Sequence, residues 1–227
     1  MNFYLLSEEI HSDSIEISDD QVHHFKNVSR GKVGDSVKVF NGKGVILTGT
    51  VTEIKKKNLT IEVTNRERKE LSKEALNLIL CVPKKEYVES IFRSAVQIGI
   101  RNLYLIHTKF SPWKFKNSPR LDKILTGAMV QSENPFLPEI TFLNTLEDMN
   151  SIKGKKVAFL TEVDKPITKS SDAILNFIIG PEGGFHEEEI SFFEDNEDVF
   201  CMKLPAPIMK AETAVNFGAG FLKGLSF

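Results

Sequence analysis

Two loops in the last third of the chain carry the residue types that could bind a cofactor and act on a substrate. The stretch 177–185 reads FIIGPEGGF, a short apolar run that breaks into a glycine-rich loop. Glycine lets a backbone approach a ligand closely, so a buried strand followed by such a loop is typical of a binding site. The stretch 204–214 reads LPAPIMKAETA and follows a second short apolar run.

The glycine-rich loop does not have the spacing of the common phosphate-binding motifs. It lacks both the GxxxxGK[ST] pattern of a P-loop and the GxGxxG pattern of a dinucleotide site. Two interpretations remain, a tight structural turn or a loop that binds an adenosine-type cofactor through backbone groups. Open α/β sheets bind ligands beyond the carboxyl ends of their strands, so two such loops together favour the cofactor.

The second loop also contains a cation, a carboxylate and a hydroxyl in close succession, at Lys210, Glu212 and Thr213. A cation can stabilise negative charge that develops on a substrate. Glu212 and Thr213 equally suit the first turn of the helix that the sequence predicts from about 211 to 221. A purely structural role at the helix start is therefore the alternative for these two residues.

The chain up to about residue 70 consists of short β-like segments with turns between them. Strands are predicted at 35–40, 45–54 and 59–63, and the Asn-Gly-Lys-Gly sequence at 41–44 predicts a hairpin turn. A short helix with an acidic start is predicted at 19–25. Several short strands at this spacing indicate a small β-barrel.

A charge-rich stretch at 65–74 marks the predicted domain boundary, and we interpret it as a solvated connector rather than an RNA contact. Beyond it the pattern becomes α/β. Strands are predicted at 75–82, 103–106, 157–161, 177–179 and 199–204, and helices at 86–98 and 119–131, with a further helix starting at 186–190. This alternation predicts a mostly parallel sheet covered on both faces.

The composition indicates a globular protein and gives no overall sign of nucleic-acid binding. The 227 residues are 41% hydrophobic and 26% charged, with a net charge of -2. A basic excess is absent, although a local basic face remains compatible with this total. Cys81 and Cys201 are expected to be structural thiols in a reducing cytosol. The sequence shows no cysteine and histidine set for a metal, no signal peptide and no membrane span, so we expect a cytoplasmic protein without metal.

The two loop motifs together resemble the RsmE family of 16S ribosomal RNA uridine-N3 methyltransferases, which belong to the SPOUT superfamily. GPEGGF with acidic residues after it, and LPxxIxKAETA, carry the resemblance. It implies a PUA-like, RNA-binding β-barrel over 1–70 and a SPOUT methyltransferase domain over 71–227 with a C-terminal trefoil knot. It further implies S-adenosylmethionine as the cofactor, a homodimer, and 16S ribosomal RNA, within the small ribosomal subunit, as the substrate.

In the resembling family the two loops and a preceding strand end enclose S-adenosylmethionine. The residues that this implies for cofactor binding are Thr161, Glu162, Ile179, Gly180, Pro181, Glu182, Gly183, Gly184, Leu204, Ile208, Met209, Thr213 and Ala214.

The same resemblance places Lys210, Glu212 and Thr213 at the target base. Uridine N3 carries a proton that must leave before, or as, the methyl group transfers, and a cation at the base carbonyls would stabilise the developing uridinate. The family usually has Arg where this chain has Lys210, which keeps the charge without the planar fork. Glu212 is a candidate general base only if it is buried.

Four residues are implied as RNA contacts: His24, Arg30, Lys84 and Gln131. The alternative for His24 is a partly buried structural histidine. A further candidate is the loop in which Trp113 and Phe115 interleave with lysines, because aromatic rings can stack bases while lysines hold phosphates. The same two rings could instead anchor a partly exposed loop.

Some positions depart from the family pattern, and they motivate rival functions. Asn134 and Phe110 stand where the family has Arg. One rival is a diverged module that docks on ribosomal RNA without methyl transfer. Another is a methyltransferase with the same cofactor that acts on a different RNA nucleotide, and a weaker one is a hydrolase that binds phosphate through the glycine loop.

Overall fold

The computed structural model describes residues 1–6, 11–18, 20–161, 163 and 173–226. Contacts divide the chain into two compact units. The first consists of Met1–Leu71 with Thr126–Leu137, and the second of Ser72–Leu125 with Pro138–Phe227.

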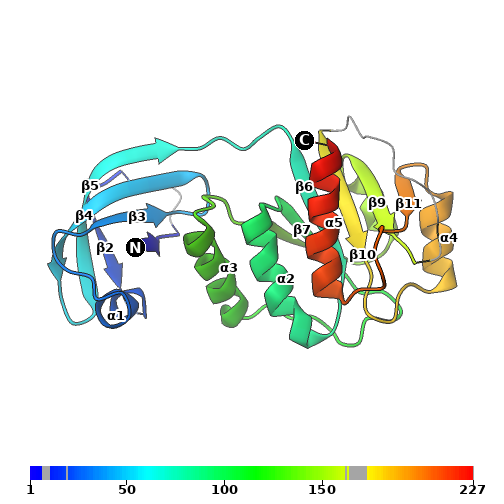
Figure 1. The fold of residues 1–227 in the computed structure, drawn as a ribbon, viewed down its shortest axis with the longest axis horizontal. Helices are drawn as coiled ribbons and strands as arrows, with labels where there is room; N and C mark the ends of the chain where they lie inside the picture. The colour runs from blue at the N-terminus through cyan, green and yellow to red at the C-terminus, as the bar shows by residue number, and fades with distance from the viewer. Residues whose placement is uncertain (7–10, 19, 162, 164–172, 227) are drawn as a thin grey trace. The chain divides into compact units, whose positions relative to one another are not determined.

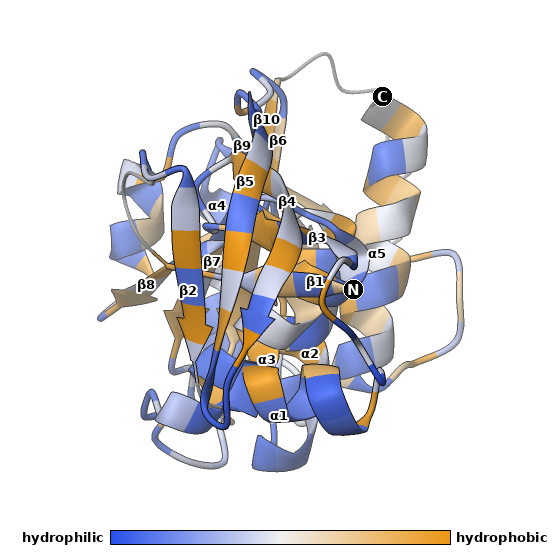
Figure 2. Ribbon diagram, turned by 90° about the vertical axis from the view of Figure 1, so that its left-hand side faces the viewer, coloured by the Kyte–Doolittle hydropathy of each residue, from blue (hydrophilic) through white to orange (hydrophobic). Residues whose placement is uncertain are grey.

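The first unit is built on a curled five-stranded sheet. Its strands are β1 (Asn2–Tyr4), β2 (Ser14–Ser18), β3 (Ser36–Phe40), β4 (Val45–Ile54) and β5 (Asn58–Arg68). The order β1-β3-β4-β5-β2 places β1 and β2 at the two edges, so the sheet is a half-barrel (Figure 1). Figure 2 shows hydrophilic and hydrophobic bands along β5, as expected where one face of a strand is buried.

The predicted hairpin turn between β3 and β4 is confirmed. The side-chain oxygen of Asn41 accepts hydrogen bonds from the backbone N–H groups of Lys43 and Val45, both at 2.8 Å. Gly42 and Gly44 adopt φ angles of 76° and 93°, a region that favours glycine. The turn chemistry in the sequence therefore sets the register of this hairpin.

Helix α1 (Asp20–Asn27) closes the core of the first unit. Phe25 of α1 is buried and its ring lies 5.5 Å from that of Phe3 in β1. The described part of the predicted helix at 19–25 is thus helical. β1 and β2 are short edge strands that were not predicted from the sequence.

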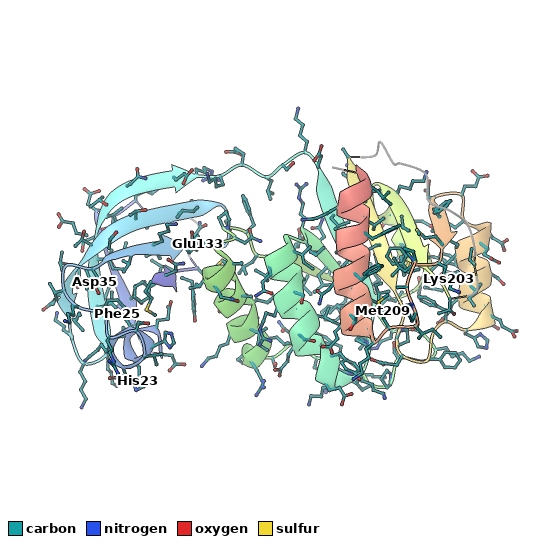
Figure 3. All side chains as sticks on the ribbon, in the orientation of Figure 1. His23, Phe25, Asp35, Glu133, Lys203 and Met209 are labelled. Atoms are coloured by element: carbon teal, nitrogen blue, oxygen red, sulfur yellow. The ribbon has the colours of Figure 1, made fainter. Side chains whose placement is uncertain are left out.

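The connector predicted at 65–74 is wrong at its start, because Asn65–Arg68 continue β5 and pair with β4. The charged side chains stay exposed while the backbone groups are satisfied by the sheet. Helix α3 (Pro119–Ser132) follows later in the chain, and from Thr126 onward it belongs to the first unit. Glu133, labelled in Figure 3, pairs with Lys38 of β3 at 2.5 Å, and the N–H of Gly44 donates to the carbonyl of Pro135.

The second unit contains a six-stranded parallel sheet. Its strands are β6 (Ala75–Cys81), β7 (Asn102–Ile106), β8 (Glu139–Leu143), β9 (Lys155–Phe159), β10 (Ile174–Ile179) and β11 (Val199–Met202). The order is β11-β9-β10-β6-β7-β8 and each neighbouring pair is parallel. The central strands β6 and β10 are buried almost throughout, which explains their continuous apolar runs.

Helices cover both faces of this sheet, as predicted. Helices α2 (Lys85–Ile98) and α5 (Ala211–Ser226) lie side by side on one face (Figure 1). On the other face Phe193 of α4 (Glu187–Asp195) and Met149 of the short 3-10 helix η1 (Glu147–Ser151) pack against Ile79 and Ile178. The predicted fold class, an N-terminal β-barrel followed by an α/β domain, is confirmed, with the barrel present as a curled half-barrel.

Three further findings bear on the sequence predictions. Cys81 and Cys201 are buried and form no disulfide, as predicted for structural thiols. In the part of the chain that the structure describes, no helix is both long enough and apolar enough to cross a membrane. Within the same residues, no three His, Cys, Asp or Glu side chains come together in a way that could hold a metal ion.

Candidate active site

A cavity of about 500 Å³ lies at the carboxyl ends of β9, β10 and β11 in the second unit. The end of β9 contributes Phe159 to Thr161, the loop after β10 contributes residues 180–185, and the loop after β11 contributes residues 203–204 and 206–209. Met209 and Lys203, labelled in Figure 3, both come from this last loop. The volume falls in the range of small-molecule sites, and the position is where open α/β sheets bind their ligands.

The cavity brings together most of the residues predicted to bind the cofactor. Those that line it are Thr161, Ile179, Gly180, Pro181, Glu182, Gly183, Gly184, Leu204, Ile208, Met209 and Ala214. Thr213 is not among the described lining residues, and Glu162 lies outside the residues that the structure describes. The lining also includes Phe159, Phe185, Glu194 and Lys203, which the sequence analysis did not single out.

Each of the three glycines in this loop occupies a position where a side chain would clash or the backbone would be strained. A Cβ on Gly180 would lie 2.9 Å from the ring of Phe185, and a Cβ on Gly183 would lie 3.0 Å from the Cβ of Phe110. Gly184 has a φ of 73°, which other residues rarely adopt. Gly183 therefore makes room for Phe110, and residues 180–184 all line the cavity.

The glycine loop is tied to the start of α2 through Glu182. The two carboxylate oxygens of Glu182 lie 3.0 and 3.3 Å from the backbone nitrogen of Lys84, which donates to them. Lys84 is the N-cap residue of α2, and its own side chain makes no capping bond. A carboxylate at a helix N-terminus is favoured by the helix dipole, so this contact stabilises both the loop and the helix start.

The end of the glycine loop is fixed by a capping box on α4. Nδ1 of His186 accepts from the N–H of Glu188, and the N–H of His186 donates to Glu189 at 2.8 Å. The buried Glu189 carboxylate also accepts from the N–H of Lys109 at 2.7 Å. Glu189 falls in the helical first turn predicted at 186–190, but its capping role was not predicted, although an acid three residues into a helix is a recognisable capping signal.

Lys210 and Glu212 lie beside the cavity and face α2. The Lys210 ammonium is 5.6 Å from the centre of the Tyr87 ring, and Oγ of Ser90 donates to Glu212 at 2.5 Å. Lys210 follows Met209 and precedes Ala211, both of which line the cavity. A hydrogen bond to Glu86, followed by burial and the nearby carboxylates of Glu86, Glu182 and Glu212, raises the pKa of the Tyr87 hydroxyl.

The residues predicted to contact RNA fall in both units. Three of them are exposed residues of the first unit: His24 on α1, Gln131 on α3, and Arg30 in the segment after α1. The exposure of His24 argues against a structural histidine, and Arg30 has an unusual φ of 52°. Lys84 belongs to the second unit, next to Glu182.

The aromatic loop at 113–115 has a structural role. Nε1 of Trp113 donates to the carbonyl of Pro83 at 2.8 Å. Phe115 is buried, and its ring stacks on that of Phe92 at 5.7 Å. The interpretation that Phe115 stacks RNA bases is therefore wrong, because its ring is part of the packing against α2.

Comparison with known proteins identifies the class. The profile of the RNA methyltransferase domain matches residues 69–223, and that of the RNA methyltransferase PUA domain matches residues 17–64. The chain belongs to this RNA methyltransferase family.

Its relatives are of the RsmE type, which confirms the resemblance seen in the motifs. The chain is 28% identical over 219 residues to ribosomal RNA small subunit methyltransferase E of Rickettsia conorii, covering 93% of this chain and 90% of the relative. It is also 28% identical over 213 residues to the protein of the same name from Helicobacter pylori strain J99, covering 91% of this chain and 92% of that protein.

Solved structures share the fold. The chain superposes on ribosomal RNA small subunit methyltransferase E of Neisseria gonorrhoeae, a crystal structure with bound S-adenosyl methionine, with a TM-score of 0.85 and 21% identity. That match covers 99% of this chain and 97% of the other. A probable rRNA methyltransferase of Porphyromonas gingivalis gives a TM-score of 0.82 at 22% identity, covering 99% and 98%.

Proposed function

We propose that this chain transfers a methyl group from S-adenosylmethionine to N3 of a uridine in 16S ribosomal RNA. The observation that carries the proposal is the cavity in which the two loops meet beside Lys210. Family membership supplies the reaction class, and the names of the relatives support the small-subunit substrate.

The cavity fits the cofactor. Its volume of about 500 Å³ lies within the range of sites for ligands of this size, and its lining mixes apolar side chains with exposed loop backbone. Backbone groups of residues 180–184 and 204–209 would hold the adenosine part without any side-chain signature. When bound, S-adenosylmethionine supplies an electrophilic methyl group on a sulfonium, which needs mainly alignment with its acceptor.

Lys210 is the residue proposed to act on the base. A bound S-adenosylmethionine would supply the methyl group and leave as S-adenosylhomocysteine, while the uracil N3 that accepts the methyl group would give its proton to solvent. Negative charge develops on the uracil carbonyls as the proton leaves, and the exposed ammonium of Lys210 can stabilise it. Glu212 is half-buried and already accepts a hydrogen bond from Ser90, which favours a positioning role over a role as general base.

The first unit is proposed to bind RNA, in keeping with its match to a PUA domain. His24, Arg30 and Gln131 are exposed there, and Lys84 adds a cation near the cavity. A homodimer is proposed through α5, where Phe217 is exposed and its ring stacks on Phe221 at 6.4 Å. The trefoil knot and an assembled small subunit as substrate are further parts of the proposal that rest on the resemblance. A cytoplasmic location is proposed because it fits a ribosomal RNA substrate.

The test is methyl transfer to small ribosomal subunits from cells that lack this activity, followed by nucleoside analysis by mass spectrometry. N3-methyluridine is the expected product. A different methylated nucleoside would favour the rival that acts on another RNA nucleotide. Binding of S-adenosylhomocysteine and of subunits, measured by calorimetry and sedimentation, without any transfer would favour the docking module.

A further inference from the structure

The start of α5 is attached to α2 by two side-chain contacts that no sequence motif marks. Tyr87 and Ser90 lie three residues apart on α2 and therefore face the same side of the helix. Tyr87 meets Lys210 and Ser90 meets Glu212, two residues at the amino end of α5. None of these four residues is among the described residues that line the cavity.

The first contact places an aromatic ring beneath a cation. The Lys210 ammonium lies 5.6 Å from the centroid of the Tyr87 ring, within the range of a cation–π interaction. A lysine side chain has four rotatable bonds and a large rotamer entropy, so an exposed ammonium without such a contact samples many positions. The ring therefore limits the ammonium to positions near the first turn of α2.

The second contact fixes the backbone from which Lys210 projects. Ser90 donates to Glu212, and the carbonyl of Lys210 accepts from the N–H of Ala214 at 2.9 Å, as expected of the residue that caps α5. Ala214 in turn lines the cavity. A change in the position of Glu212 would therefore move both the cation and part of the cofactor wall.

We propose that Tyr87 and Ser90 are positioning residues for methyl transfer, with Tyr87 holding the Lys210 ammonium at the target base and Ser90 fixing the start of α5 through Glu212. The inference rests on the proposed function of Lys210 and adds two residues of α2 to the acceptor side of the site. Because Tyr87 lies outside the described cavity lining, its loss should reduce turnover and leave cofactor affinity unchanged.

The test compares Tyr87→Phe with Tyr87→Leu. Phenylalanine keeps the ring face, whereas leucine keeps apolar volume without it. Tyr87→Leu is expected to lower kcat by about two- to fivefold, the range of an exposed cation–π contact, and Tyr87→Phe to retain most of the activity. The affinity for S-adenosylhomocysteine should stay within about twofold in both. Glu89→Gln, on the same helix but bonded to Arg120, is the matched control.

A double-mutant cycle separates positioning from general packing. In the Lys210→Ala background, Tyr87→Leu should cause no further loss, because the cation that it holds is gone. Ser90→Ala should lower kcat, and Glu212→Gln, which keeps an oxygen acceptor, should lower it less than Glu212→Ala. Equal losses from Tyr87→Leu with and without Lys210, or equal losses from Phe and Leu at position 87, would overturn the inference.

An activity-independent readout distinguishes failure of this inference from failure of the proposed function. The ring of Tyr87 should shift the side-chain proton resonances of Lys210 upfield, a shift kept in Tyr87→Phe and lost in Tyr87→Leu. A wild-type chain that transfers no methyl group would overturn the proposed function. In that case the ring-current shift would still test the inference: its presence would support the contact between Tyr87 and the Lys210 ammonium, and its absence would overturn it.

Discussion

The carboxylate of Glu182 and the backbone nitrogen of Lys84 form the link between the glycine loop and α2, at distances of 3.0 and 3.3 Å. The two residues are 98 positions apart in the chain. This link, the Tyr87–Lys210 contact and the Ser90–Glu212 bond connect both cofactor loops to the first two turns of α2. The amino-terminal part of α2 is therefore the common support of both loops.

Removing this link should loosen the glycine loop. Glu182→Ala deletes a helix-capping interaction of about 1 kcal/mol, so we expect the affinity for S-adenosylhomocysteine to fall by about fivefold. Glu182→Gln retains an oxygen acceptor and should have a smaller effect. Calorimetric titration gives the affinities, with Glu187→Ala on the exposed first turn of α4 as the control. An unchanged affinity for Glu182→Ala would show that the loop holds its shape without the link.

Gly183 should tolerate no side chain while Phe110 is present. A Cβ at this position would lie 3.0 Å from the Cβ of Phe110, so Gly183→Ala should displace the loop and weaken cofactor binding. Overpacking costs about 1–3 kcal/mol, which corresponds to at least about a fivefold loss of affinity.

A second substitution, at Phe110, tests whether this close contact is the reason for the loss of affinity. Phe110→Ala combined with Gly183→Ala should recover part of the affinity, because the space is then free. Gly127→Ala on α3, where a Cβ meets nothing within 4 Å, should leave binding unchanged. If the double variant binds as weakly as Gly183→Ala, the glycine is needed for the ligand itself and not for Phe110.

Lys210 should matter for turnover and not for cofactor affinity. Lys210→Ala removes the cation proposed to stabilise the developing uridinate, and kcat should fall by roughly 100- to 1,000-fold. Lys210→Arg keeps the charge and should retain most of the activity. Single-turnover methyl transfer with saturating subunits is the measurement. A Lys210→Ala variant with normal turnover would remove this residue from the mechanism.

Phe217 should control the oligomeric state. Its side chain is 39% exposed on α5, and Gly220 and Gly224 leave open space on the same helix. Phe217→Glu places a charge on this apolar face and should convert the proposed dimer into a monomer in light scattering. Asn216→Glu changes the neighbouring exposed residue and is the matched control. Loss of the dimer in both variants would point to a general charge effect.

The two cysteines should resist alkylation in the folded protein. Burial, together with the Glu189 carboxylate, raises the pKa of the Cys81 thiol, and the thiolate is the reactive form. Cys201 is also buried. Mass spectrometry after treatment with iodoacetamide at neutral pH should show unlabelled native chains and labelling at both cysteines in urea. Rapid native labelling at Cys81 would show that β6 opens locally.

The sequence predicted those elements whose start, end or turn is determined by residues within the element itself. The hairpin at 41–44 follows from its own turn residues, and α2 ends at Gly99, whose φ of 80° terminates the helix. The buried strands β6 and β10 followed from their continuous apolar runs. The two loops that line the cavity were predicted because glycine and proline residues directly follow the ends of two predicted strands.

Features that depend on distant parts of the chain could not be predicted in this way. β1 has only three residues and depends on pairing with β3. The charged end of β5 is a strand because it pairs with β4. Tyr87 and Ser90 look like ordinary residues of an amphipathic helix, and the Ser90–Glu212 bond spans 122 positions. The prediction that Phe115 stacks RNA bases was wrong because alternation of aromatic rings with lysines does not reveal whether a ring is buried, as this one is against Phe92.

The division of α3 between the two units has a consequence for how the protein is made. The first unit needs Thr126–Leu137, whose backbone bonds to the β3–β4 hairpin through Pro135 and Leu137. Because a nascent chain emerges from its amino end, Ser72–Leu125 leaves the ribosome before this segment does. The half-barrel can therefore be completed only after β6 and β7 of the second unit have been synthesised, so its completion is coupled in time to the synthesis of that unit.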